Sequence, residues 1–273
     1  MTRLIAVLCL VALAGPGAAT AEIREVKTSQ NTFQPRTLNV LAGDQVSWMN
    51  QSFSEKHNLG EPFNKELAPR ETWLNPTPFD TKGVIHYLCT IHPTMAGTIA
   101  VHDVYLRGPG ATVLFGNAMS FSGLAPVGET VEIQRDVSGV WTTVDTVVAG
   151  SKDAFGKGVK PAVPGRYRAE IPAGVSPVVQ VAVKPRVTLA KKRLPRKRTR
   201  VTVAAAPNRA GAVAVLQRKK PAGWAKIASK RLGTKSKAAF VVRPPKGTWR
   251  VRALVKASGG YAAGQSGVIT VKR

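Results

Sequence analysis

One short stretch of the chain, "CTIHPTM", spaces Cys89, His92 and Met95 three residues apart, and a further histidine, His57, lies in "KHN" upstream. Together these side chains offer a thiolate, two imidazoles and a thioether. Such a donor set, with the thioether as a weak axial ligand, suits a mononuclear copper ion that changes between Cu(II) and Cu(I). Zinc is the alternative, although zinc usually prefers more thiolate or carboxylate and no thioether.

The chemistry of Cys89 depends on where the chain matures. Arg3, the apolar run "LIAVLCLVALAG" and the small residues around Ala21 are typical of a signal peptide, predicted as residues 1–21. Removing it removes Cys9 and leaves Cys89 as the only cysteine, which excludes an intramolecular disulfide. Cys89 is then either a metal-bound thiolate or a buried thiol in a site that has lost its metal.

The remaining histidines, His86 and His102, are not predicted as ligands. His86 stands three residues before Cys89, so strand alternation turns it to the opposite face. His102 follows the last strand of its region. We interpret both as surface or packing residues.

Strands must position the donors, because the whole chain shows strand patterns. Alternation with a period of two occurs in "TLNVLAG", "QVSWMN", "GTIAVH", "TVEIQR" and "WRVRALV", and no window shows a sustained helical stripe. The sequence therefore predicts an all-β chain of sandwich-sized units. We predict a first domain over residues 22–103.

An internal repeat predicts two further domains, over residues 104–185 and 186–273. "VEIQRDVSGVWTTV" resembles "VAVLQRKKPAGWAKI", which matches Gln134 with Gln217 and Trp141 with Trp224. "PGRYRAEI" likewise resembles "KGTWRVRAL", which matches Tyr167 with Trp249. We expect two tandem immunoglobulin-like β-sandwich modules, with each Trp in a small core.

Residues 22–103 resemble the small cupredoxins of the plastocyanin and amicyanin type, which are Greek-key β-sandwiches. The resemblance rests on "FQPRTLNVLAGDQVSWMN", on the Cys-x-x-His-x-x-Met spacing and on the His-Asn pair at 57 and 58. It implies one type 1 copper, with His57, Cys89, His92 and Met95 as ligands. Asn58 would hold the two ligand loops together. One departure is that no proline precedes His57.

The resemblance implies single-electron transfer, with a redox partner that docks near His92. The sequence shows no H-x-H pairs for an oxidase, no G-x-S-x-G motif and no Gly-rich phosphate loop, so we expect a carrier and not an enzyme. An alternative is copper capture or delivery without a redox partner. Another is an adhesive envelope protein whose β modules serve for attachment.

The positive charge of the chain lies in its last third. Residues 22–103 hold 7 Lys+Arg and 9 Asp+Glu, residues 104–185 hold 8 and 6, and residues 186–273 hold 24 and none. This favours contact with anionic envelope polymers or phospholipid head groups, with a merely solubilised surface as the alternative. Export and the lack of interleaved aromatic residues disfavour nucleic acid. With no transmembrane segment expected, we predict a secreted, periplasmic or envelope-associated protein.

Overall fold

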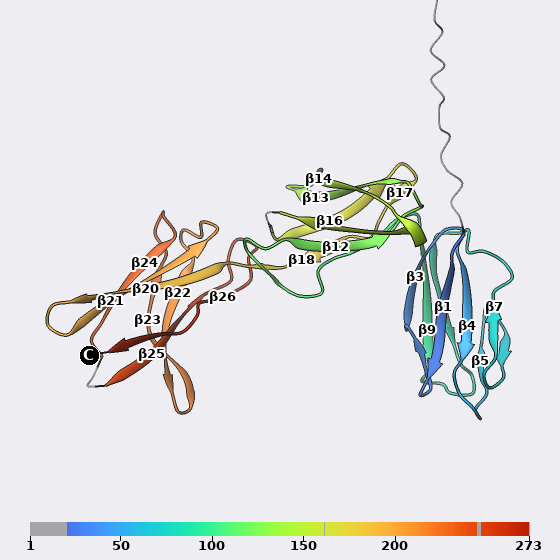
Figure 1. Cartoon of the computed structure of the whole chain (residues 1–273), viewed down its shortest axis with the longest axis horizontal. Helices are drawn as coiled ribbons and strands as arrows, with labels where there is room; N and C mark the ends of the chain where they lie inside the picture. The colour runs from blue at the N-terminus through green and yellow to red at the C-terminus, as the bar shows by residue number, and fades with distance from the viewer. Residues whose placement is uncertain (1–20, 161, 245–246, 273) are drawn as a thin grey trace, which may run out of the picture. The chain divides into compact units, whose positions relative to one another are not determined.

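The computed structural model describes residues 21–160, 162–244 and 247–272, and these form strands joined by turns (Figure 1). The predicted all-β class is confirmed. The single helical element described is one 3₁₀ turn, η1 (Ser151–Asp153). Residues 1–20 of the predicted signal peptide, with Cys9, lie outside the described residues. No helix in the described part is long and apolar enough to cross a membrane.

The described chain divides into two compact units. The first takes in the residues up to Tyr105 together with Leu124–Thr130 and Val148–Phe155, and the second takes in the rest. The predicted boundary between residues 185 and 186 falls inside the second unit and stays a prediction.

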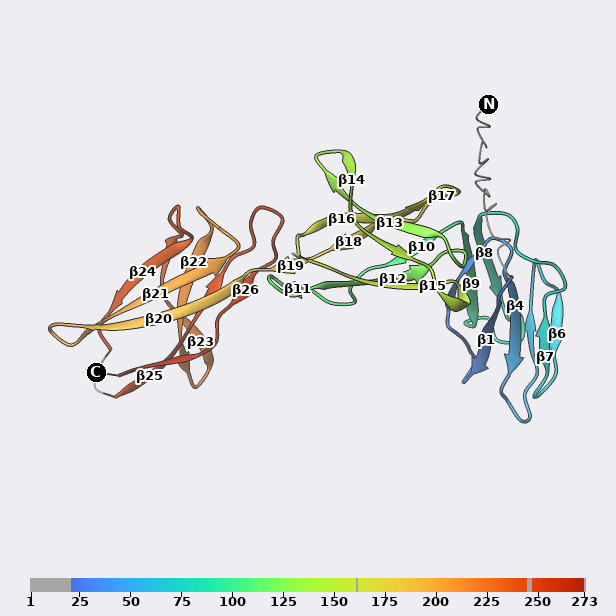
Figure 2. The same ribbon diagram turned by 45° about the horizontal axis from the view of Figure 1, so that its top comes forward.

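The first unit contains two main sheets. The order of the first sheet is β2 (Thr32–Gln34), β1 (Ile23–Ser29), β4 (Gln45–Asn50) and β7 (Thr72–Leu74). The second runs β3 (Thr37–Leu41), β9 (Ala96–His102) and β8 (Gly83–Leu88), and β5 (His57–Leu59) pairs with β6 (Lys65–Leu67). The pairs β1–β4 and β3–β9 are parallel, and Figure 2 shows β1 beside β4. The patterns "TLNVLAG", "QVSWMN" and "GTIAVH" fall on β3, β4 and β9, as predicted.

An aromatic core fills the first unit. Trp48 is fully buried and its ring lies 4.9 Å from that of Phe63 and 5.7 Å from that of Tyr87. Tyr87 also contacts Phe33, at 4.7 Å between ring centroids. Aromatic contacts of this kind add to the hydrophobic stabilisation of burial. Cys89 and Met95 belong to the same buried cluster, so the predicted ligand turn is anchored in the core.

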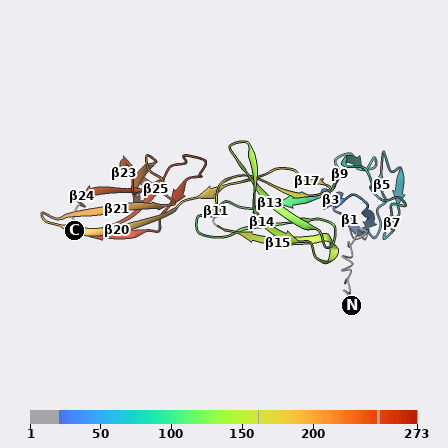
Figure 3. The same cartoon turned by 90° about the horizontal axis from the view of Figure 1, so that it is seen from above.

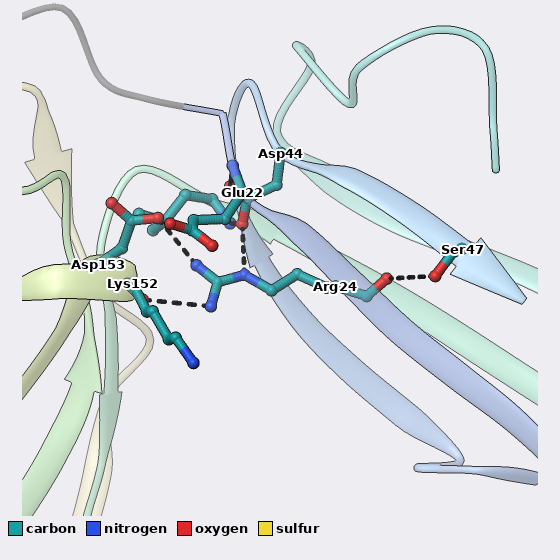
Figure 4. Close-up of polar contacts among 7 residues, drawn as sticks. Glu22, Arg24, Asp44, Ser47, Lys152 and Asp153 are labelled. Atoms are coloured by element: carbon teal, nitrogen blue, oxygen red, sulfur yellow. Dashed lines mark hydrogen bonds and ion pairs between the residues drawn. The ribbon is translucent and has the colours of Figure 1, made fainter.

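A polar cluster centred on Arg24 joins three segments of the first unit (Figure 4). Arg24 Nε donates to Asp44 Oδ2 at 3.0 Å, and Nη2 donates to Asp153 Oδ2 at 2.9 Å. Asp44 also accepts hydrogen bonds from the backbone N–H groups of Glu22 and Leu41. The two carboxylates therefore share a single guanidinium.

The second unit begins with short strands and one larger sheet. The small sheets are β10 (Tyr105–Arg107), β12 (Met119–Leu124) and β15 (Ala154–Val159), and the parallel pair β11 (Val113–Leu114) and β19 (Val183–Lys184). The larger sheet runs β14 (Val140–Val148), β13 (Thr130–Val137), β16 (Gly165–Ile171) and β17 (Gly174–Val175), with β18 (Val179–Val181) also on β16.

Two further sheets enclose the core at the C-terminal end of the second unit. One runs β20 (Arg186–Leu194), β21 (Arg198–Ala206) and β24 (Lys237–Val242), and Figure 3 shows β20 beside β21. The other runs β23 (Gly223–Arg231), β22 (Val213–Lys220), β25 (Thr248–Val255) and β26 (Gly264–Gln265), with β27 (Ile269–Lys272) also on β25. Leu216, Phe240 and Val251 are among the buried residues between them.

The internal repeat is visible as matched hydrogen bonds. Arg168 Nε donates to Gln134 Oε1 at 2.9 Å, and Arg252 Nε donates to Gln217 Oε1 at 2.9 Å. Each arginine follows a residue that pairs with the neighbouring strand in the same register, Tyr167 in one copy and Val251 in the other.

One of the predicted matches is therefore wrong by two residues. Tyr167 pairs with Arg135 and Val251 pairs with Arg218, so Tyr167 corresponds to Val251 and not to Trp249. The match of Gln134 with Gln217 fits the structure. A slip of two residues leaves every side chain on its original face of a strand, so alternation alone does not reveal it. The expectation that Trp141 and Trp224 fill small cores is wrong, because both are half-buried on the outward face beneath Arg168 and Arg252.

Candidate metal centre

A short hairpin presents His57. His57 begins β5 and pairs with Leu67 of β6. In β5 the side chains of His57 and Leu59 point inward, because residues two apart share a face of a strand. His57 is 2% exposed. A nearly buried imidazole is thus held beside the core cluster.

The other donors come from the tight connection between β8 and β9. These strands pair up to Leu88 and Ala96, so residues 89–95 form the connecting turn. The N–H of Cys89 donates to the carbonyl of Met95 at 2.9 Å, and the N–H of Met95 donates to the carbonyl of His92 at 2.8 Å. These bonds close the turn, which brings its three predicted donor residues into one loop.

Three of the four predicted ligands converge. The donor atoms of His57, Cys89 and His92 all lie within 4.8 Å of one another. Cys89 Sγ is 3.7 Å from His92 Nδ1, and the two imidazole rings are 4.9 Å apart between centroids. Cys89 is fully buried and His92 is half-buried. Met95 lies in the same turn and is also fully buried.

The arrangement fits a soft metal ion. His57 Nδ1 is buried and has no hydrogen-bond partner among the described residues. A buried polar atom without a partner is costly unless something else satisfies it, and a metal ion would do so. Burial lowers the pKa of His57, helped by the nearby His92 and opposed by Glu55. The neutral imidazole, which is the form that binds a metal, is therefore favoured.

Asn58 joins the two ligand segments. Its Nδ2 donates to Thr90 Oγ1 at 2.6 Å, and the N–H of Thr90 donates to Asn58 Oδ1 at 2.7 Å. The N–H of Asn58 also lies 3.4 Å from Cys89 Sγ, as a donor to that sulfur. Asn58 was named from the sequence, whereas Thr90 was not. The sequence signal for Thr90 was its position directly after Cys89.

Gly60 brings the same segments close together. Its N–H donates to the carbonyl of Leu88 at 2.8 Å. A Cβ at this position would lie 3.1 Å from that carbonyl oxygen, so glycine suits the close approach. Sequence reasoning did not single out Gly60.

His86 and His102 lie outside the cluster formed by the other two histidines. His86 is exposed, and its Nδ1 lies 3.2 Å from Thr98 Oγ1. His102 Nε2 lies 3.0 Å from Asn39 Oδ1, and its ring stacks on Tyr105 at 5.2 Å between centroids. Both contacts agree with the predicted surface and packing roles.

Comparisons with known proteins give a limited likeness. No family model matches the sequence, and no curated protein matches it. Among solved structures, the chain is similar to the reduced state of an amicyanin variant, with 26% identity, 31% of this chain, 85% of that chain and a TM-score of 0.27. An oxidised amicyanin variant is 22% identical, over 29% of this chain and 81% of that chain, with a TM-score of 0.27. A reduced Cu(I) amicyanin variant at pH 4 is 23% identical, over 33% of this chain and 88% of that chain, with a TM-score of 0.26.

Proposed function

We propose that this chain is an exported carrier of single electrons that binds one copper ion through His57, Cys89 and His92, with Met95 as a weaker fourth ligand. The observation that carries the proposal is the buried donor cluster, in which His57 Nδ1 has no other partner among the described residues. Copper held by such donors supplies a one-electron couple between Cu(II) and Cu(I). The sequence resemblance of residues 22–103 to cupredoxins supports the same choice of metal.

The protein's own contribution is to hold the donors in place. The bonds between Asn58 and Thr90 fix the segment of His57 against the turn that carries Cys89. The N–H of Asn58 donates to the cysteine sulfur and so helps to fix its position. Little rearrangement is then needed when the charge at the site changes, and fast electron transfer requires this.

His92 is the proposed route for electrons to a partner. It is half-buried, whereas His57 is nearly inaccessible. Leu88, which precedes the turn, and Ile91, which lies within it, are 45% and 48% exposed. We expect the partner protein to dock on this apolar surface around His92. The chain is assigned no catalytic step of its own.

The test is the visible spectrum of the purified protein after one equivalent of Cu(II), then ascorbate, then a mild oxidant. We expect an intense blue band that bleaches and returns. The band should be lost in Cys89→Ser and retained in His86→Ala, which removes an exposed histidine outside the cluster.

Each other outcome has a definite meaning. Copper that binds without a reversible spectral change would contradict electron transfer and favour capture or delivery. Preference for zinc over copper would contradict the assigned metal. If the protein binds neither metal, Cys89 is a buried thiol. An adhesive role for the chain is then favoured.

A further inference from the structure

The C-terminal sheets have no internal source of negative charge. Residues 186–273 contain 24 Lys and Arg and no Asp or Glu. Correspondingly, no ion pair within the described residues includes a side chain from 186–272. The two repeats allow a direct comparison of where these charges lie.

In the first repeat, the arginines on the outward face of the sheet β14–β13–β16 are neutralised by carboxylates on the same face. The guanidinium of Arg168 lies 4.5 Å from the centroid of the Trp141 ring and pairs with Glu170 at 2.9 Å. Arg166, two residues before it on the same face, pairs with Asp136 at 3.1 Å. The cations of this face therefore have partners within the sheet.

A third carboxylate completes that face. Glu132 Oε2 accepts hydrogen bonds from Thr143 Oγ1 at 2.6 Å and from Gln134 Nε2 at 3.1 Å. Glu132 on β13 lies directly opposite Glu170 on β16 in the strand register. With two arginines and three carboxylates, the ladder around Trp141 carries a small negative charge.

The second repeat keeps the arginine, glutamine and tryptophan side chains of this face but has none of its carboxylates. The guanidinium of Arg252 lies 4.2 Å from the centroid of the Trp224 ring and donates to Gln217, as Arg168 does to Gln134. By the strand register, Val215, Lys219 and Leu254 stand at the positions of Glu132, Asp136 and Glu170.

Six cations remain on the outward face of the sheet β23–β22–β25–β27. Alternation and cross-strand pairing place these side chains on one face: Lys219, Lys226, Arg231, Arg250, Arg252 and Lys272. Residues two apart on one strand are separated by about 7 Å, and neighbouring strands by about 5 Å. The face is thus a regular array of cations in which Arg252 is held in place by Gln217 and Trp224.

We propose that this face binds a linear phosphate-linked polymer. Arginine forks and lysine ammonium groups are the usual partners of phosphate oxygens. Their spread over several strands suits an extended chain of charges better than one small anion. Because Arg252 covers the Trp224 ring, the face offers no open aromatic surface on which a nucleobase could stack, which argues against single-stranded nucleic acid. This inference is independent of the proposed copper function.

The experiment restores the missing carboxylates. We would measure binding of a poly(glycerol phosphate) chain to the full protein and to Lys219→Asp/Leu254→Glu, over a range of salt concentrations. The matched control is Lys192→Asp/Val241→Glu, which makes the same change of charge on the outward face of the opposite sheet. Polyglutamate, a mixed-sequence single-stranded oligonucleotide and anionic lipid vesicles serve as comparison ligands.

We expect affinity for the phosphate polymer to fall as salt rises, and the restored variant to bind at least about tenfold more weakly. The control should bind nearly as well as the parent. Lys226→Gln/Arg250→Gln, compared with Lys192→Gln/Arg200→Gln, gives the same test should the first variant fail to fold. All four of these positions are exposed.

Several results would overturn the proposal. Equal losses in variant and control would mean that total charge, and not this face, determines binding. Equal or tighter binding of polyglutamate would contradict phosphate recognition. Tighter binding of the oligonucleotide, or binding to vesicles alone, would assign the face to nucleic acid or to membrane.

Discussion

Gly97, two residues after Met95, shows how a residue next to the ligand turn is constrained by packing. Gly97 lies within β9 and pairs with Tyr87 of β8. The Tyr87 ring covers it, and an added Cβ would collide with that ring. Glycine is needed here because an aromatic side chain occupies the space of its absent side chain.

We therefore expect Gly97→Ala to lower the free energy of unfolding of the first unit by about 2 kcal/mol, as overpacking in a filled core does. Denaturant unfolding followed by tryptophan fluorescence measures this. Gly150→Ala, also in the first unit, is the control, since the nearest atom to its added Cβ lies at an ordinary contact distance of 3.6 Å and its effect should stay below about 0.5 kcal/mol. Equal stability of Gly97→Ala and the parent would contradict the packing argument.

Residue types and spacing predicted the donor cluster but not its supports. Cysteine, histidine and methionine three residues apart are informative without a structure, because few other roles require that combination. The positions of Thr90 and Gly60 depend on a contact between segments about 30 residues apart, which leaves no local pattern. For the same reason, the burial of Gly97 beneath Tyr87 could not be predicted.

Among the elements, β1 depends most on a partner that is remote in sequence. Arg24 on β1 binds Asp44, which follows β3, and Asp153, which ends η1. Both carboxylates are almost inaccessible, with 3% and 2% of their side-chain surface exposed. Burial and the neighbouring Asp44 raise the pKa of Asp153, and Arg24 opposes this rise. Removing the guanidinium would leave two buried carboxylates close together.

We predict that Arg24→Ala lowers the free energy of unfolding of the first unit by about 3 kcal/mol, because breaking a buried ion pair leaves uncompensated charge. Chemical denaturation measures the loss. Lys27→Ala on the same strand breaks an exposed pair with Glu25, and it should cost less than about 1 kcal/mol. A similar cost for both substitutions would show that the Arg24 cluster adds little to stability.

The strands themselves were largely predictable, whereas their matching between repeats was only partly so. Alternation located strands such as β4, β9 and β25, because each buries one face. The same alternation permitted the slip of two residues between Tyr167 and Val251. The backbone pairing of the strands fixes the register, and the cross-strand hydrogen bonds of Gln134 and Gln217 agree with it.

For the molecule as a whole, stability should depend on pH at both ends of the range. Burial lowers the pKa of His102, with Asp103 opposing, so the unfolded chain binds this proton more readily. The contribution of His102 is therefore complete above its ordinary pKa of 6.5 and is lost as the pH falls. Burial raises the pKa of Tyr87 to about 12, so its contribution is complete below 10.0 and is lost as the pH rises toward 12.

Denaturant unfolding of the metal-free protein from pH 5 to pH 12 tests this expectation. His102→Gln should flatten the acid side of the profile, and Tyr87→Phe should flatten the alkaline side. Profiles unchanged by these substitutions would mean that other groups determine the dependence on pH.

The parallel pairing of β3 with β9 has a consequence for how the chain folds. These strands are about 60 residues apart, and such distant contacts form slowly because a long loop must close first. The turn from Cys89 to Met95 is closed by local hydrogen bonds, but Cys89 is buried only once the core cluster around it has formed. Until then the thiol lacks the shelter of the core and the N–H of Asn58. The interval before β9 docks is therefore when a nascent chain is most vulnerable to oxidation and to cross-linking with another molecule.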